Sequence, residues 1–590
     1  MNKRLGILTT KQILRIGYLL PILFLIWHVS RFYLERPWFD HWLMISFFDK
    51  VASGNVRLAD LFAIHAGDHR PVFPKIIFTI LAFATGWQLK YEVYGSILLT
   101  VITFWAMCKI NSSRAGRAGG GIVYVTNLFT CMLLFSLVQE TSWKWGWAQL
   151  LFLVNTCVAL AVLSLMPTDP RHVYRKFSAA AACCFVASFS VVHGLLSWIA
   201  LLPSVIQLAL SDARRARLLA IWISLAAATW ALYFVGFDPG KETGPFFLLL
   251  RTDPLRIGRY FFSLLGCPLG GFTLWTLGSV GGNPVLTALG VAVVAGFSFF
   301  SVVIFKNLRS RFGRYGIPWV SVGLFALLYA AANTAGRVSG LSGGPKNPIY
   351  ATPATLLSVS VIQLGGLFLG YDSIERRRFH KLAYQVLAGV SVGVITCLIS
   401  LNYAYFIAGD VPREEDAIRD KACLELAYYL EPWNTCDIAV GSFSEEVRIL
   451  DRLGFRNFRK DLKLVTDPPE DYGRVESVEK RVARNEAVIK GWARFPDREQ
   501  QPSIVMLSRN RESPPAFFAY AVVNLESPDV AQGFGSRKYS RARWEGRISI
   551  RPTSIFEVAL PAGQTTIRAW VYDPDRDELV LLKGEVSVER

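Results

Sequence analysis

The chain has 590 residues, of which 52% are hydrophobic and 18% are charged. Soluble domains carry about a quarter charged residues, so this composition argues against a soluble protein and for one that lies in a lipid bilayer. The net charge of +18 does not indicate nucleic-acid binding, because Lys and Arg gather in short loops between apolar segments, where they orient a membrane protein.

Apolar segments long enough to cross a bilayer recur along the first two thirds of the chain. No small-residue cleavage site follows the first one, which is therefore expected to be a signal anchor. In all we expect about eleven transmembrane helices. They are predicted at residues 13–33, 91–110, 121–138, 148–166, 177–193, 194–211, 217–236, 283–305, 316–335, 349–370 and 383–407.

Basic residues fall in every second loop between these segments, as they do in the cytoplasmic loops of membrane proteins. The pattern starts before the first segment and continues to the last loop, with Lys3, Arg4, Lys11 and Arg15, then Lys109, Arg114 and Arg117, then Arg171, Arg175 and Lys176, then Arg214, Arg215 and Arg217, then Lys306, Arg309, Arg311 and Arg314, and finally Arg376, Arg377, Arg378 and Lys381. We therefore expect a cytoplasmic N-terminus and, after an odd number of spans, a C-terminal domain outside.

Two further apolar pieces, 71–87 and 257–280, would break this alternation if they spanned the membrane. The first is short and contains two prolines and a lysine, and the second is rich in glycine. Both are predicted to be amphipathic or re-entrant segments on the outer face. The outer face then gathers the loops 34–90, 139–147, 237–282 and 336–348.

After the last span, residues 411–472 have helical periodicity, and residues 473–590 have short alternating runs separated by Gly, Pro and Asp. We predict a helical or mixed α/β segment followed by a β-sandwich. Cys423 and Cys436 are able to form a disulfide there if the region is extracytoplasmic and the geometry permits. Trp492, Trp544 and Trp570 fit either the core of the sandwich, which is the favoured interpretation, or an exposed glycan-binding surface.

The first outer loop, 34–90, carries the most informative residues. Asp40 lies among Trp38, Phe39 and Trp42, and about thirty residues later comes the stretch DHRPVFPK, which begins at Asp68. Carboxylates held among aromatic residues near a bilayer are costly to desolvate, so they usually have partners or functions. The alternative is that Asp40 caps the interfacial helix HWLMISFFDKV.

This order of a first span, an acidic residue, an interfacial helix and a His/Arg-Pro segment resembles the GT-C superfamily of membrane glycosyltransferases. His69-Arg70-Pro71 is similar to the His-Pro-Pro-type segment of protein O-mannosyltransferases and lipid A aminoarabinose transferases, with Arg70 in place of a proline. DHRPVFPK and residues 139–149 (QETSWKWGWAQ) are similar to motifs of uncharacterised bacterial GT-C-like proteins, with Lys75 where those have arginine. The resemblance extends over about residues 13–410 in architecture and leaves the β domain unexplained.

The resemblance implies an enzyme that moves a sugar from a polyprenyl-phosphate carrier to a cell-envelope glycan or lipid, on the outer face of a bacterial inner membrane. Asp40 matches the catalytic acidic residue, as a base for the acceptor hydroxyl. The departing phosphate needs positive charge, for which Arg70, Lys75 and Arg337 are candidates. Tyr350 lies where relatives have Ser-Arg-Tyr, but here the preceding residues are Asn-Pro-Ile, so an arginine is missing.

Other residues of the outer loops are candidates for the same site. Asp68 and Glu140 are able to bind Mg²⁺, Mn²⁺ or Zn²⁺ together with Asp40 or His69, although their spacing does not demand a metal. Trp145, with Trp143 and Trp147, either lines an entrance for the sugar or isoprenoid or forms an aromatic belt. The histidines His28 and His193, isolated in or beside spans, are expected to make hydrogen bonds within the bundle.

Two other classes of function remain open. A transporter or flippase of lipid-linked glycans would place ionisable residues at mid-membrane, and the predicted spans are almost free of them. A non-catalytic envelope assembly protein would use the β domain as its working part. The predicted organisation is a GT-C-like α-helical transmembrane domain (1–410), a mixed segment (411–472) and a β-sandwich (473–590).

Overall fold

The computed structural model packs the chain into two units, which are described separately. The helical unit contains Met1–Tyr33, Arg57–Ile80 and Lys90–Asp410, and the second unit contains Leu34–Val56, Leu81–Leu89 and Val411–Arg590. The structure describes residues 10–33, 35–65, 69–112, 120–166, 170–209, 215–237, 243–273, 283–338, 350–375, 381–408, 424–429, 443–456, 458, 461–481, 485–509, 515–550 and 563–590. Two pieces of the first outer loop thus pack with the C-terminal residues.

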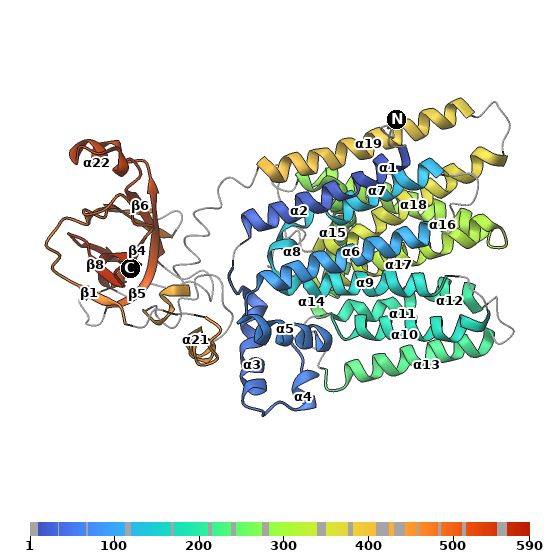
Figure 1. Ribbon diagram of the computed structural model, residues 1–590, viewed down its shortest axis with the longest axis horizontal. Helices are drawn as coiled ribbons and strands as arrows, with labels where there is room; N and C mark the ends of the chain where they lie inside the picture. Colours follow the sequence, from blue (N-terminus) through green and yellow to red (C-terminus); the bar gives the residue numbers. More distant parts are fainter. Residues whose placement is uncertain are drawn as a thin grey trace, which may run out of the picture. The chain divides into compact units, whose positions relative to one another are not determined.

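The helical unit is a bundle whose long helices are apolar, which confirms a polytopic membrane protein (Figure 1). In the described part, nine helices are long and apolar enough to cross a membrane. They are Leu14–Phe32, Lys90–Ser112, Gly121–Lys144, Gly146–Ser164, Val192–Ala209, Ala216–Phe234, Pro284–Lys306, Arg311–Arg337 and Ala351–Gly370. The other two predicted segments are helical too, as α10 (Val173–Ser188) and α19 (Lys381–Ala408).

The labelled helices of the bundle include those that form the spans and several shorter ones. They are α1 (Thr10–Gly17), α2 (Leu19–Phe32), α4 (Leu58–Leu61), α6 (Lys90–Ser112), α7 (Gly120–Leu134), α8 (Glu140–Lys144), α9 (Gln149–Ser164), η5 (Val192–Leu196), α11 (Ser197–Ala200), α12 (Leu202–Ala209), α13 (Arg215–Phe234), α14 (Thr243–Thr252), α16 (Pro284–Lys306), α17 (Arg311–Arg337) and α18 (Ala351–Glu375). At one end of the bundle, α2, α7, α13 and α17 finish and α6, α9 and α16 begin. We call this end the site end.

The two apolar pieces that were not counted as spans form short helices. The first is α5 (Val72–Thr85), and the second begins as α15 (Pro254–Gly270). At about 1.5 Å per residue neither reaches the roughly 30 Å of a bilayer core. Asp253 begins α15 by accepting a hydrogen bond from the Arg256 N–H, and Pro254 takes the first helical position. Helix α14 was not predicted.

Helix α15 packs across residues at the site end of α16, α17 and α19. Gly266 and Gly290 allow the backbones of α15 and α16 to touch, because a Cβ on Gly290 would lie 1.8 Å from the Phe262 carbonyl oxygen. Asn402 of α19 donates to the carbonyls of Pro268 and Leu269 at 3.3 and 3.1 Å. These bonds satisfy the orphan carbonyls at the end of α15, so its position is fixed from two sides.

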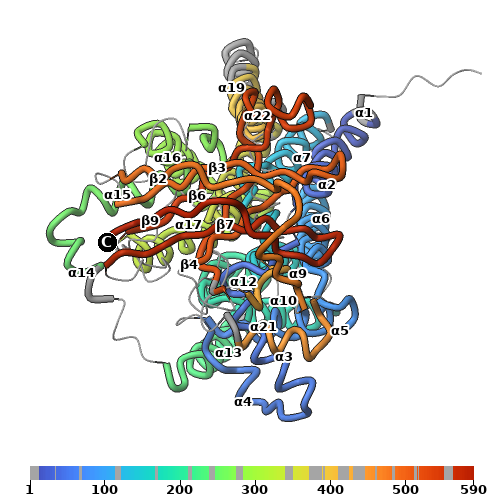
Figure 2. Tube along the Cα trace, turned by 90° about the vertical axis from the view of Figure 1, so that its left-hand side faces the viewer, coloured from blue at the N-terminus to red at the C-terminus, as the bar shows by residue number. Residues whose placement is uncertain are grey.

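The second unit contains a β domain near the C-terminus, as predicted, and its first strand begins at Lys463 (Figure 2). Its strands are β1 (Lys463–Val465), β2 (Gly473–Arg481), β3 (Glu486–Ala493), β4 (Ile504–Arg509), β5 (Ala516–Leu525), β6 (Arg543–Ser549), β7 (Gln564–Asp573), β8 (Glu578–Leu581) and β9 (Val586–Glu589). Two short helices, α22 (Pro528–Gly533) and η11 (Arg537–Tyr539), lie between β5 and β6.

The strands follow one hydrogen-bonded path, in the order β1-β8-β7-β4-β5-β6-β3-β2, with β9 beside β7. The path curls back on itself, because Val475 of β2 donates to the Lys583 carbonyl at 2.8 Å and Lys583 donates to Gly473 at 3.0 Å. This differs from a sandwich of two separate sheets. Strand β1 lies in the predicted mixed segment. The alternating run 579–588 forms two strands, β8 and β9, and Gly584 between them has a φ of 82°.

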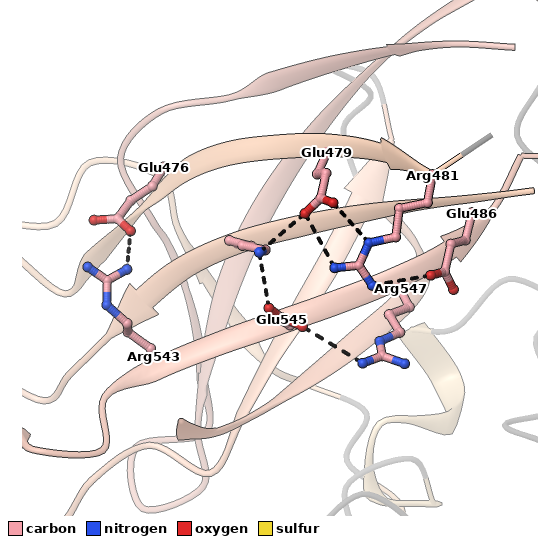
Figure 3. Close-up of polar contacts among 8 residues, drawn as sticks. Glu476, Glu479, Arg481, Glu486, Arg543, Glu545 and Arg547 are labelled. Carbon is pink, nitrogen blue, oxygen red and sulfur yellow. Dashed lines mark hydrogen bonds and ion pairs between the residues drawn. The ribbon is translucent and has the colours of Figure 1, made fainter. Parts of the chain in front are cut away.

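The three tryptophans of the β domain belong to its interior. Trp492, Trp544 and Trp570 are 5%, 1% and 3% exposed, which confirms the core interpretation over the glycan-binding one. The outer face of β2, β3 and β6 instead carries alternating charges (Figure 3). Lys490 there bridges Glu479 and Glu545 at 3.4 and 3.3 Å. The predicted strand 555–561 and the two cysteines of the predicted disulfide lie outside the described residues.

Replacing Arg498 by methionine is expected to destabilise the β domain by about 3 kcal/mol. Its guanidinium pairs with Asp573, whose side chain is completely buried, so the substitution leaves a buried carboxylate without its counter-ion. The measurement is amide hydrogen exchange in β7 and β8, which should become about a hundredfold faster. Arg481→Met removes a pair with Glu479, whose side chain is half exposed, and should change exchange by less than about fivefold. Equal effects of both variants would contradict the prediction.

Candidate functional site

Several of the predicted site residues lie at the site end of the helical unit. Arg337 is the last residue of α17, and Tyr350 directly precedes α18. Glu140 begins α8, and His69 and Arg70 directly precede Pro71 and α5. Asp68 lies outside the described residues. The antiparallel course of the helices therefore brings together residues that are more than 250 positions apart in the sequence.

Arg337 belongs to a cluster of tyrosines that we call the Arg337 cluster, formed by Tyr260, Tyr329, Asn333, Arg337 and Tyr350. The Tyr260 hydroxyl of α15 donates to Asn333 Oδ1 of α17 at 3.1 Å, and the Tyr329 hydroxyl donates to the Tyr350 carbonyl at 3.2 Å. Burial raises the pKa of Tyr260, an effect that neighbouring Tyr350 reinforces and Arg337 opposes. Tyr260 and Tyr329 are therefore committed to bonds within the wall, and Arg337 supplies the positive charge.

His193 extends this cluster toward the first loop. Its ring packs edge-on against Tyr329, with 4.6 Å between ring centroids, and it interacts electrostatically with His69. The side chain is 9% exposed, and its Nε2 has no hydrogen-bond partner within the described residues. The expected hydrogen bond within the bundle is thus not seen for this nitrogen. His193 instead joins the Arg337 cluster to the segment that carries His69.

A backbone bridge to His65 holds His69. The backbones of His65 and His69 exchange two hydrogen bonds, of 2.7 and 3.1 Å. The His65 ring stacks on Trp147 at 4.5 Å, and Phe78 of α5 stacks on the same indole at 5.2 Å. Trp147 therefore contacts both His65 and α5. Sequence reasoning did not single out His65.

Arg70 and Lys75 hold the first loop in place. The Arg70 guanidinium donates to the carbonyls of Tyr233, at 2.7 Å, and Val235 at the C-terminal end of α13, and to the Phe62 carbonyl at 2.5 Å. A cation at this position is favoured by the helix dipole. The buried Lys75 ammonium donates to the carbonyls of Asp60 and Ala63 at 3.2 and 3.1 Å. These bonds give both side chains a structural task.

The segment 139–149 is packed inside the protein for most of its length. Trp143 stacks on Phe152 at 4.3 Å and is fully buried, as is almost all of Trp147. An aromatic belt or an entrance is therefore wrong for these two, while Trp145 is half-buried. Glu140 accepts a hydrogen bond from Lys144 at 2.6 Å. Among the residues that the structure describes, no three His, Cys, Asp or Glu side chains form a group able to hold a metal.

Asp40 belongs to the second unit and is the second residue of η1 (Phe39–Met44). The residue before it, Phe39, has a φ of 46°, in the left-handed region that a bulky side chain rarely adopts. Such strain costs about 1–3 kcal/mol and is concentrated at functional sites. The N-cap position is Trp38, and the next helix, α3 (Ile45–Ala52), is preceded by Met44, so capping by Asp40 is wrong.

A second element of the same unit clamps α3. After α21 (Phe443–Arg452), Phe455 packs edge-on against Phe83 and Phe48 at 5.1 and 6.0 Å. Arg456 bonds Glu35 at 3.0 Å and the Trp87 carbonyl at 2.9 Å. We call Arg452, Phe455 and Arg456 the latch. It ties the residues that follow the last helix to the residues on both sides of Asp40.

Replacing Phe455 by alanine is expected to release the segment 35–56 from the rest of its unit. The buried ring contributes about 3 kcal/mol or more, so amide exchange in α3 should become at least a hundredfold faster. Arg452→Ala is the matched control, because its pair with Asp49 is largely exposed and contributes less than about 1 kcal/mol. Unchanged exchange in Phe455→Ala, measured by mass spectrometry, would contradict the role of the latch.

Comparisons with known proteins give one kind of match. No family model and no curated protein matches the chain. Two solved structures do, both of ArnT from Cupriavidus metallidurans. The complex with undecaprenyl phosphate has 14% identity and a TM-score of 0.37, over 76% of each chain. The apo form has 14% identity and a TM-score of 0.36, over 77% of this chain and 87% of that one. Matches at this identity and TM-score carry no argument about the function of this chain.

Proposed function

We propose that this protein is a membrane glycosyltransferase that moves a sugar from a polyprenyl-phosphate carrier to a cell-envelope glycan or lipid. The observation that carries the proposal is the Arg337 cluster. It places one guanidinium beside buried phenols at the end of an apolar helix bundle, where a lipid-linked phosphate would meet it. The carrier's apolar chain would remain in the bilayer beside the bundle.

Arg337 would bind the phosphate of the carrier and stabilise it as it leaves. Guanidinium groups bind phosphate through two parallel hydrogen bonds, and the negative charge on the phosphate increases as the glycosidic bond breaks. Because Tyr260 and Tyr329 use their protons within the cluster, they hold α15, α17 and Tyr350 at fixed spacing around the arginine. His69 and His193 would line the side that faces the sugar.

Asp40 would be the base of the reaction. It would take the proton of the acceptor hydroxyl as the oxygen attacks the anomeric carbon, and the bond to phosphate would break with its electron pair going to the carrier. This displacement inverts the anomeric configuration and balances without a further reactant. The half-buried state of Asp40 and the strain at Phe39 support a functional role for this carboxylate.

The test is transfer by the purified full-length protein in lipid vesicles. The donor is a polyprenyl-phosphate sugar carrying a radiolabel, and the acceptors are glycan and lipid fractions of bacterial envelopes. We expect the label to move to one acceptor fraction with release of one lipid phosphate per sugar. Movement of the intact donor across the bilayer without any acceptor would instead identify a flippase. The absence of both reactions would indicate an assembly protein.

A further inference from the structure

A groove lies in the helical unit near the end opposite the site end. Figure 1 shows the helices α11, α12, α16 and α17 that flank it. It has a volume of about 790 Å³, within the range of about 300–1,000 Å³ that is usual for ligand sites. Its walls come from α11, α12, α17 and the last turn of α16. The lining residues are Ile199, Leu202, Pro203, Ile206, Gln207, Phe305, Leu308, Arg309, Arg314, Ile317 and Leu324.

The inner part of the groove is apolar and open. Ile199, Ile206 and Phe305 are 41%, 45% and 48% exposed, so the groove presents hydrocarbon to whatever fills it. Along α17 the lining extends ten residues, from Arg314 to Leu324, a rise of about 15 Å. This is half of the roughly 30 Å hydrocarbon core of a bilayer, which is the depth of one leaflet. The shape and chemistry suit an acyl chain.

The mouth of the groove is basic. Arg309 and Arg314 are both exposed, and neither guanidinium makes a hydrogen bond or ion pair within the described part of the chain. Between them and the apolar wall, Gln207 donates to the Arg314 carbonyl at 2.7 Å. Its Oε1 is buried without a hydrogen-bond partner among the described residues. Two cations and an unused amide oxygen thus surround the point where an acyl chain would emerge.

We propose that this groove binds an anionic phospholipid, with one acyl chain between α12 and α17 and the phosphodiester between Arg309 and Arg314. The two guanidinium groups complement the charge of the phosphodiester, and the free Gln207 oxygen would accept a bond from a headgroup hydroxyl. A neutral phospholipid fits the apolar wall but leaves the two cations unmatched. The site is independent of the proposed transfer reaction and lies at the other end of the bundle.

The test is lipid binding to the purified full-length protein in detergent, measured by native mass spectrometry. Phosphatidylglycerol is compared with phosphatidylcholine of the same chains, with short-chain phosphatidylglycerol and with inorganic phosphate. We expect long-chain phosphatidylglycerol to bind at least tenfold more tightly than each of the other three. In the double variant Arg309→Gln/Arg314→Gln, its affinity should fall about tenfold or more, because each basic residue near an anionic headgroup contributes about fivefold.

The matched control is the double variant Lys306→Gln/Arg311→Gln, which removes the same charge from two neighbouring exposed residues that do not line the groove. It should leave the affinity within about threefold of the original. An equal loss in both variants would show attraction by diffuse surface charge and would overturn the proposal. So would equal binding of phosphatidylcholine, or tighter binding of a polyprenyl phosphate than of phosphatidylglycerol. An unchanged unfolding temperature checks that both variants fold.

Discussion

Replacing Asp40 by asparagine is expected to lower the rate of sugar transfer about a thousandfold, since a positioned base contributes about a hundredfold to ten-thousandfold. Asparagine has the size of aspartate but cannot take the acceptor proton at neutral pH. His41 and Trp42 hold the turn through bonds to Trp38 and Pro37, and these two bonds do not involve the Asp40 carboxylate. The measurement is label transfer in vesicles, normalised to the amount of protein.

Two variants make the Asp40 result specific. Asp40→Glu keeps a carboxylate and should retain more activity than Asp40→Asn. Asp60→Asn is the matched control in the same loop, because asparagine can still accept the hydrogen bond from the Arg57 N–H. It should transfer sugar at close to the original rate. Full activity of Asp40→Asn would contradict the role of Asp40 as the base. It would not test the role of Arg337.

Replacing Arg337 by alanine is expected to reduce transfer about a hundredfold to a thousandfold, the usual effect of losing one donor to a developing negative charge. Tyr260 and Tyr329 bond to Asn333 and to the Tyr350 backbone, so the wall of the cluster should remain when the guanidinium is gone. The rate should fall even at saturating donor, because the contact strengthens as the phosphate leaves. The measurement is the transfer rate as a function of donor concentration.

The chemistry of the arginine is tested by two further variants. Arg337→Lys keeps the charge but loses the planar fork, and it should recover only part of the rate. Arg259→Ala is the matched control, since Arg259 is an exposed arginine of α15 next to Tyr260. It should leave the rate within about threefold. If Arg259→Ala and Arg337→Ala lose the same activity, the general positive charge of this region matters and the specific site is wrong.

The helical architecture was readable from the sequence because the bilayer imposes it. A run of about twenty apolar residues between alternately basic loops favours a membrane-spanning helix over any other element, and helices form at all the predicted segments. The short helices α5 and α15 were also anticipated, from the prolines and glycines that interrupt them. In the β domain, alternating apolar positions predicted most strands. The curl that bonds β2 to Lys583 was not predictable, because it depends on pairing between distant strands.

The site was predictable only in part, because some of its residues lie inside apolar helices. Arg337 is the last residue of α17 and Tyr350 directly precedes α18, and polar residues at the ends of apolar helices attract notice in a sequence. Tyr260 and Tyr329 lie in apolar helices and have no sequence signal, and only the packing of α15 against α17 brings them together. Similarly, the sequence around Arg70 does not show whether this arginine binds phosphate or caps a helix. In the structure it caps the C-terminal end of α13.

The latch has a consequence for biosynthesis. Arg452 bonds a residue 403 positions earlier, and Arg456 bonds one 421 positions earlier. During translation, the turn that bears Asp40 leaves the ribosome long before these partners exist. That turn cannot reach its final packing until the whole bundle has been inserted and the chain beyond residue 456 has been made. A truncated or half-inserted product would therefore have an unfinished first loop, and the order of synthesis itself would keep an incomplete molecule inactive.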